Sequence, residues 1–247
     1  MLALAEDHEL VFYDQRGGGK SRTDDPTPIT WQTHVEDLAA VANELAFDRP
    51  EIIGYSWGGL LAMLYTTAAS RQSPVASSLV LLDPAPITRK HREQFEAEFS
   101  RRQQGPVVQQ MRAELAASGL RERDPDAYRQ RSFELSVAGY FADPARAHDL
   151  MPFRVVGRVQ QSVWSSLGDF DLTSRLTDVA VPSLIVHGRQ DPIPLESSEI
   201  AARALGARLV VLDDCGHVPY VEQPQSLFEA VREFLTRHTP VRRREAQ

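Results

Sequence analysis

The chain has 247 residues and a formal net charge of −7, with 42% hydrophobic and 25% charged residues. These values are typical of one large soluble α/β domain, and the negative charge argues against a general nucleic-acid-binding role. A single cysteine, Cys215, excludes an internal disulfide, and no apolar run of about 18 residues or basic-then-apolar N-terminus indicates a membrane span or a signal peptide.

The first predicted elements are the end of a helix at Met1–Glu6 and a short strand at Glu9–Asp14. The glycine-rich loop Gln15–Ser21 has neither P-loop nor dinucleotide-binding spacing, so we predict a tight loop near a site rather than a phosphate cradle. A helix is predicted from Thr30 to Phe47 because its apolar residues recur with the helical period.

The next stretch, Gly54-Tyr55-Ser56-Trp57-Gly58, follows a short apolar run and leads into an apolar helical segment. This is the pattern G-x-S-x-G between a strand and a helix, which holds a serine in a strained turn with its hydroxyl exposed. We expect a Cβ at either Gly54 or Gly58 to collide with the neighbouring backbone. The pentapeptide alone is also compatible with an ordinary glycine-rich turn that carries a surface serine.

The remaining chain alternates strands and helices, apart from a charged, mostly helical segment at 88–168 that we interpret as a cap. Nearly all-apolar strands alternating with helices predict a mostly parallel sheet flanked by helices. We therefore expect an α/β core at 1–87 and 169–241, the cap at 88–168 and a flexible charged tail at 242–247. Beyond the cap and the tail, the predicted elements are strands at Ser78–Asp83, Val181–Gly188 and Arg208–Asp213 and helices at Glu196–Leu205 and Pro224–Arg237.

Three residues with complementary chemistry follow predicted strands: Ser56, Asp191 and His217. A serine hydroxyl needs a neighbouring base, a histidine can supply one near neutral pH, and a carboxylate orients the histidine. Their order along the chain, serine, then acid, then histidine, is the order typical of one type of catalytic triad. Asp83 is a rival acid because it also ends a strand. Asp191 and His217 could each be ordinary loop residues, but three coincidences in the right order are improbable.

No H-E-x-x-H pattern or Cys/His cluster occurs, so no metal or other cofactor is predicted. We expect Cys215 to be a small loop or core residue rather than a nucleophile. The partners we predict are a small molecule or a short peptide as substrate, with no nucleic acid and no membrane, in the cytoplasm. The oligomeric state is left open.

The chain resembles the α/β-hydrolase superfamily and, within it, the proline iminopeptidase branch of serine peptidases. Four segments carry the resemblance: Tyr13–Ser21, Gly54–Gly59, Gly188–Asp191 and Gly216-His217. The resemblance implies an α/β-hydrolase fold with a helical cap and an acyl-enzyme formed on Ser56. It also implies that the Trp57 N–H serves as one oxyanion donor.

In the iminopeptidase branch, the substrate is a short peptide with an N-terminal proline, whose free amine is bound by acidic side chains largely from the cap. The resemblance makes Glu134, Asp169 and Asp171 candidates for this role. Gln160 lies near the position where an acid is expected. This departure leaves room for an ester or amide substrate, so a carboxylesterase or lactonase is the alternative enzyme.

A second departure concerns an H-G-G-P-G-like loop that relatives carry upstream of the Asp14 strand. That loop follows a central strand and supplies the other oxyanion N–H. We therefore expect the sequence to be an N-terminally truncated version of a longer hydrolase, with N-terminal strands missing. A third reading is an inactive fragment or binding module that keeps the triad without the oxyanion loop.

Overall fold

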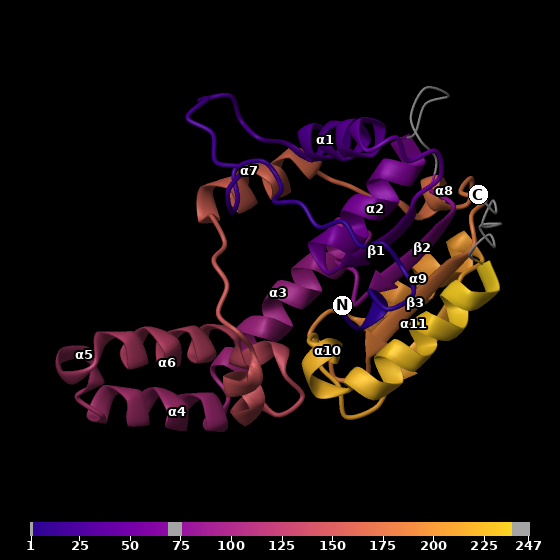
Figure 1. Cartoon of the computed structure of the whole chain (residues 1–247). Coiled ribbons are helices and arrows are strands. Elements are labelled where there is room, and N and C mark those ends of the chain that lie inside the picture. Colours follow the sequence, from indigo (N-terminus) through magenta and orange to yellow (C-terminus); the bar gives the residue numbers. More distant parts are fainter. Residues whose placement is uncertain (1, 69–75, 239–247) are drawn as a thin grey trace.

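A computed structural model describes residues 2–68 and 76–238, and the predicted tail at 242–247 lies outside them. Within these residues the fold is centred on a parallel four-stranded sheet in the order β1-β2-β3-β4 (Figure 1). The strands are β1 (Glu51–Tyr55), β2 (Ser78–Leu82), β3 (Ser183–Gly188) and β4 (Arg208–Leu212). The prediction of a parallel sheet flanked by helices is therefore confirmed.

The two central strands are buried along their whole length, as their apolar sequences predict. Side chains of β2 alternate between two cores: Leu79 and Leu81 belong to one, and Val80 and Leu82 to the other. The first core is covered by α2 (Trp57–Ala68), α8 (Thr173–Leu176) and α9 (Leu195–Leu205), and the second by α11 (Pro224–His238). Helices on both faces satisfy the demand of a parallel sheet for two apolar layers.

The predicted strand at Glu9–Asp14 is wrong. The segment is extended, but it forms no β-bridge to another described residue. A groove of about 880 Å³ lies between it and β1, lined by Leu10 and Val11 on one side and by Ile52 and Ile53 on the other. A strand exists only through its ladder of hydrogen bonds, so an apolar sequence without an adjacent partner stays outside the sheet.

The elements between β2 and β3 in the described part of the chain are helices joined by loops. In Figure 1, α4 to α6 project away from the sheet, and α7 returns to lie beside α1. The Ser162 hydroxyl of α7 donates to the carbonyl of Ile29 at 2.7 Å, which ties the end of this insertion to the core. The helices concerned are α1 (Trp31–Glu44), α3 (Arg89–Gln103), α4 (Pro106–Ala117), α5 (Leu120–Arg123), α6 (Pro125–Val137), η2 (Ala138–Tyr140), η3 (Pro144–Asp149) and α7 (Gly157–Leu167).

Two short helices complete the fold, η1 (Leu2–Leu4) and α10 (Pro219–Glu222). Among the described residues, no helix combines the length and the apolar character that a membrane crossing requires.

Candidate active site

Ser56 occupies the sharp turn between β1 and α2, with φ at 52°. A positive φ is unfavourable for a residue with a side chain, and such strain is concentrated at functional sites. The turn is fixed by two backbone hydrogen bonds of 2.9 Å: the Ser56 N–H donates to the Leu82 carbonyl, and the Ser56 carbonyl accepts from Ala85. The end of β2 therefore holds the serine in place.

The glycines around this turn have unequal roles. A Cβ at Gly54 would lie 2.3 Å from the carbonyl oxygen of Gly58, which confirms the predicted collision at Gly54. The same prediction for Gly58 is wrong, because a Cβ there meets nothing within 4 Å. The tight position is Gly59, whose added Cβ would lie 2.9 Å from Cβ of Pro84. The helix packs closely against β1 and Pro84 but leaves the Gly58 side open.

The structure brings Ser56, His217 and Asp191 into one hydrogen-bonded chain. His217 Nε2 lies 2.9 Å from Ser56 Oγ, and His217 Nδ1 lies 2.8 Å from Asp191 Oδ2. The carboxylate accepts the Nδ1 proton, which leaves Nε2 with a lone pair for the serine hydroxyl. Asp191 Oδ1 in turn accepts the N–H of Ile193 at 2.7 Å, so both of its oxygens are engaged.

Burial governs the ionisation of this chain. Loss of solvent lowers the pKa of His217 below its ordinary value, so the imidazole is neutral at pH 7. Burial raises the pKa of Asp191 above the ordinary carboxyl value. A neutral histidine that accepts from a serine hydroxyl is the protonation state required of a general base.

His217 is also held by residues that no sequence pattern identifies as part of the site. Tyr55 donates its hydroxyl to the His217 carbonyl at 2.8 Å, and the carbonyl of Tyr140 accepts the His217 N–H at 2.7 Å. The Tyr140 ring stacks on the imidazole with centroids 5.0 Å apart. Because Tyr55 comes from β1 and Tyr140 from η2, sheet and cap together fix the orientation of the histidine.

Glu222 is a second residue that sequence reasoning missed. Its buried carboxylate accepts the N–H of Ala142 and the N–H of Gly216, each at 2.8 Å. Gly216 immediately precedes His217, so this carboxylate joins the loop after η2 to the loop that carries the histidine. No motif surrounds Glu222 in the sequence, and only the folded chain identifies it.

Trp57 provides a possible oxyanion donor. It is the first residue of α2, where the backbone N–H has no acceptor within the helix. Its indole N–H donates to the side-chain oxygen of Gln15 at 3.0 Å, so the glycine-rich loop does lie against the serine turn. The Trp57 ring meets Trp164 of α7 edge to face at 5.3 Å, and Arg92 lies 4.1 Å over the Trp164 ring.

The predicted substrate-binding side chains are dispersed. Glu134 is buried in α6, where Arg131 forms an ion pair with it at 2.7 Å. Gln160 is exposed on α7, and Asp169 is exposed in the turn after that helix. Asp171 accepts the N–H of Thr173 at 2.8 Å. No hydrogen bond or ion pair found among the described residues joins any of these four to the triad.

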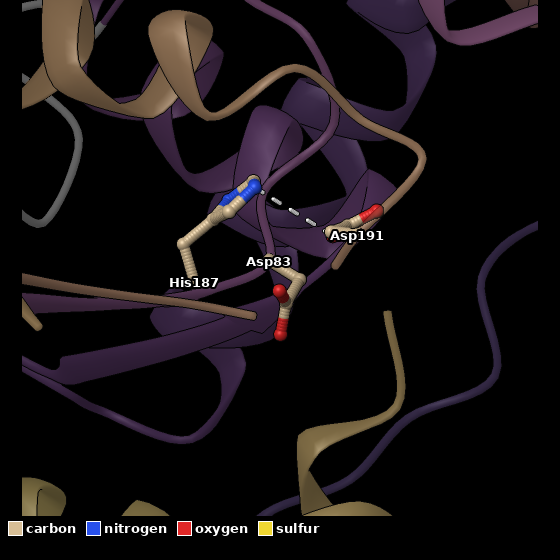
Figure 2. A group of neighbouring side chains, drawn as sticks. All are labelled: Asp83, His187 and Asp191. Carbon is tan, nitrogen blue, oxygen red and sulfur yellow. Dashed lines mark ion pairs between the residues drawn. The ribbon is translucent and has the colours of Figure 1, made fainter. Parts of the chain in front are cut away.

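Figure 2 shows a buried group of Asp83, His187 and Asp191, with one polar atom from each lying within 4.8 Å of the others. Both nitrogens of His187 are already engaged: Nε2 donates to the Ile193 carbonyl at 3.2 Å, and Nδ1 accepts from Ser198 at 2.9 Å. Burial lowers the pKa of His187 to about 4, so the ring is neutral. With no free lone pair on the histidine, the group does not fit a metal ion.

Comparison with known proteins agrees with this geometry. In sequence, the chain is 26% identical over 252 residues to a proline iminopeptidase of Lactobacillus crispatus (strain ST1), covering 96% of this chain and 83% of that protein. It is 27% identical over 254 residues to the proline iminopeptidase of Heyndrickxia coagulans, covering 95% and 84%. In structure, it is similar to proline iminopeptidase from Mycobacterium smegmatis, with a TM-score of 0.62, 23% identity and coverage of 92% and 79%.

The model of the alpha/beta hydrolase family matches residues 1–230, which is most of the chain. The parallel sheet, the strained serine between β1 and α2, and the acid and histidine after β3 and β4 have the arrangement typical of that fold. The chain therefore belongs to the alpha/beta hydrolase family.

Proposed function

We propose that the protein is a serine hydrolase that acts through an acyl-enzyme on Ser56. The observation that carries the proposal is the hydrogen-bonded chain from Ser56 through His217 to Asp191. In this mechanism, Ser56 Oγ attacks the substrate carbonyl carbon while its proton passes to His217 Nε2. The Trp57 N–H donates to the oxygen that becomes negative, and Asp191 stabilises the imidazolium.

The first tetrahedral adduct then collapses to the acyl-enzyme, and water hydrolyses the acyl-enzyme by the same chemistry. His217 gives its proton to the leaving group, which departs, and the histidine next takes a proton from water as the water attacks the acyl carbon. Collapse of this second adduct returns the proton to Ser56 Oγ and releases the acid product. The two pairs that move the proton and stabilise the imidazolium, Ser56–His217 and His217–Asp191, already lie within hydrogen-bond distance.

For the substrate, we propose the N-terminal proline of short peptides. The support is that the curated relatives named above are proline iminopeptidases and match nearly the whole chain. The edge-to-face pair of Trp57 and Trp164 also offers an apolar surface beside the nucleophile, which suits a pyrrolidine ring. Glu134, Gln160 and Asp169 remain candidates for binding the free amine.

The alternative is a carboxylesterase or lactonase, and one contact favours it. The charged group packed on the Trp164 ring is the cation Arg92, which is paired with Glu96 at 2.8 Å. Glu134, the buried acid among the candidates, is neutralised by Arg131. A free amine gains little from such surroundings, whereas an ester has no positive charge to bind. The third reading, a binding module with an incomplete oxyanion hole, predicts no turnover of either substrate.

A fluorophosphonate probe followed by substrate comparison separates these readings. We expect the purified chain to be labelled and Ser56→Ala to be unlabelled, since the probe reacts only with an activated serine. Faster hydrolysis of a prolyl arylamide than of an aryl ester supports the peptidase, and the reverse supports the esterase. Equal labelling of Ser56→Ala would refute the nucleophile, and no labelling of the wild type would favour the binding module.

A further inference from the structure

Asp83 is a buried carboxyl group that the proposed mechanism does not use. It follows β2 directly, has no solvent-exposed surface and adopts a positive φ of 39°. Its backbone N–H donates to the carbonyl of Val186 at 2.8 Å, so the neighbouring strand holds it in this strained conformation. Strain at a non-glycine residue persists only where its surroundings impose it, so the packing around Asp83 fixes the position of its side chain.

The two carboxyl oxygens of Asp83 have different surroundings. Oδ1 accepts the N–H of Gly188 at 2.8 Å. Oδ2 is buried and meets no N–H or hydroxyl donor among the described residues. The carboxyl groups of Asp83 and Asp191 are neighbours in the buried group of Figure 2, and their contact is close enough for a hydrogen bond if one of them carries a proton.

Two ionised carboxylates facing each other in a dry site repel strongly, and Oδ2 of Asp83 would lack a donor. A metal ion could bridge them, but His187 has no lone pair to complete such a site. A single proton between the carboxyls removes the repulsion and supplies the missing hydrogen bond.

The proton belongs on Asp83 rather than on Asp191. Asp191 Oδ2 accepts from His217 and its Oδ1 accepts from Ile193, and both bonds favour the ionised form. Asp83 has a single backbone donor. Burial raises the pKa of Asp83 well above the ordinary carboxyl value, and the contact with Asp191 raises it further while lowering the pKa of Asp191.

The other titratable groups around the pair do not change this assignment. Arg102 favours the ionised form of Asp191, whereas Glu222 disfavours it. The remaining neighbours coupled to Asp83 or Asp191 are Tyr55 of β1, Tyr140 of η2, His187 of β3, Cys215 and His217 of the loop after β4, and Tyr220 of α10.

We propose that Asp83 is a positioning residue whose carboxyl group stays protonated and hydrogen-bonds through its O–H to Asp191. The two acids then carry one negative charge beside His217. This inference rests on the proposed serine-hydrolase function. Asp83 would act only through Asp191: its O–H fixes the carboxylate that orients the imidazole. The charge available to stabilise the imidazolium is then a single one, localised on Asp191.

The test compares Asp83→Asn with Asp83→Ala and uses Asp178→Asn, an exposed aspartate, as the matched control. An asparagine has the shape and hydrogen-bonding pattern of a protonated aspartate, because its oxygen can accept from Gly188 while its amide donates to Asp191. The readout is the second-order rate of fluorophosphonate labelling across pH. Wild type and Ser56→Ala run in parallel, and thermal unfolding confirms that each variant is folded.

We expect Asp83→Asn to keep the wild-type labelling rate within about threefold, with its acid limb at the same pH, as a neutral side chain at position 83 requires. Asp83→Ala should lose about tenfold to a hundredfold, because Asp191 then loses the O–H donor that fixes its carboxylate. An acid limb displaced by about one unit or more in Asp83→Asn would overturn the proposal, since it would show that a charge had been removed. Full activity in Asp83→Ala would overturn it as well.

Infrared spectroscopy decides the case if the variants do not fold or the wild type does not react. With aspartate carboxyls selectively ¹³C-labelled, Glu222 does not contribute to the spectrum. We expect a protonated-carboxyl band in the wild type at pH 8, where ordinary aspartates are ionised. Absence of the band refutes the shared proton. If the band is present in a wild type that does not react with the fluorophosphonate, Asp83 is protonated although the proposed function fails. The two failures are therefore distinguishable.

Discussion

Replacement of Glu222 should weaken both the fold and the site, because its carboxylate is the acceptor for one buried and one part-buried backbone donor. These are the N–H groups of Ala142 and Gly216, each 2.8 Å away. Glu222→Ala leaves both without a partner, at about 1–3 kcal/mol each, or about 2–6 kcal/mol together. A domain of this kind is stable by only about 5–15 kcal/mol, so the loss is a large fraction of the total.

Glu222→Gln should have an intermediate effect. The amide oxygen can still accept from one of the two N–H groups, whereas the NH₂ group would face the other donor. The expected order of stability is therefore wild type, then the glutamine variant, then the alanine variant. Labelling of Ser56 should fall in the same order, because Gly216 precedes His217 in the loop that Glu222 holds.

Urea unfolding measures the stability change, and fluorophosphonate labelling measures the change at the site. Glu229→Ala is the control: this exposed glutamate also lies in the C-terminal part of the chain, and its replacement should change stability by no more than about 0.5 kcal/mol. If Glu222→Ala and Glu229→Ala unfold at the same urea concentration, the two hydrogen bonds do not contribute as argued. Loss of labelling without loss of stability would equally contradict the reasoning.

Three further predictions follow from the same structure. Gly54→Ala should lower the free energy of unfolding in urea by about 1–3 kcal/mol or more, since its Cβ would lie 2.3 Å from the Gly58 carbonyl oxygen. Gly58→Ala has open space for its Cβ and should change that free energy by less than about 1 kcal/mol. The acid limb of Ser56 labelling should lie below the ordinary histidine pKa because burial lowers the pKa of His217; a limb at or above that value in a labelling–pH profile would contradict this. The pKa of His187 falls from 6.5 to about 4 on folding, so the folded state binds fewer protons than the unfolded state and stability should drop as pH falls from 6.5 to 4. Over this range the wild type should lose about 3 kcal/mol relative to His187→Gln. Parallel stability–pH curves for the two proteins would refute the assignment.

Local patterns were sufficient to predict much of this molecule. The apolar runs of β2 and β3 and the helical period of α11 are each visible within a few residues, and each element forms where its pattern predicts. The serine turn has the same local character. Asp191 and His217 required one further step, the rule that sites gather at the carboxyl ends of parallel strands.

The features that sequence reasoning missed depend on contacts between distant segments. The strand predicted at 9–14 has the right composition but no neighbour to bond with. The role of Glu222 arises because the end of α10 lies against Ala142, 80 residues earlier. Asp83 appeared only as a rival to Asp191, whereas the register of β2 against β3 places the two acids together. A one-dimensional pattern carries no information about such pairings.

The supports of the two halves of the site differ in kind, and this difference has a consequence for function. His217 is fixed by hydrogen bonds from the sheet, through Tyr55, and from the insertion, through Tyr140. The aromatic surface beside Ser56 instead pairs the rings of Trp57 in α2 and Trp164 in α7, and the Trp57 indole also donates to Gln15. Ring contacts tolerate sliding, whereas buried backbone hydrogen bonds do not. Substrate selection should therefore vary with the position of α7 while the proton-transfer chain stays rigid, which is the arrangement expected of an enzyme whose specificity can change without loss of its chemistry.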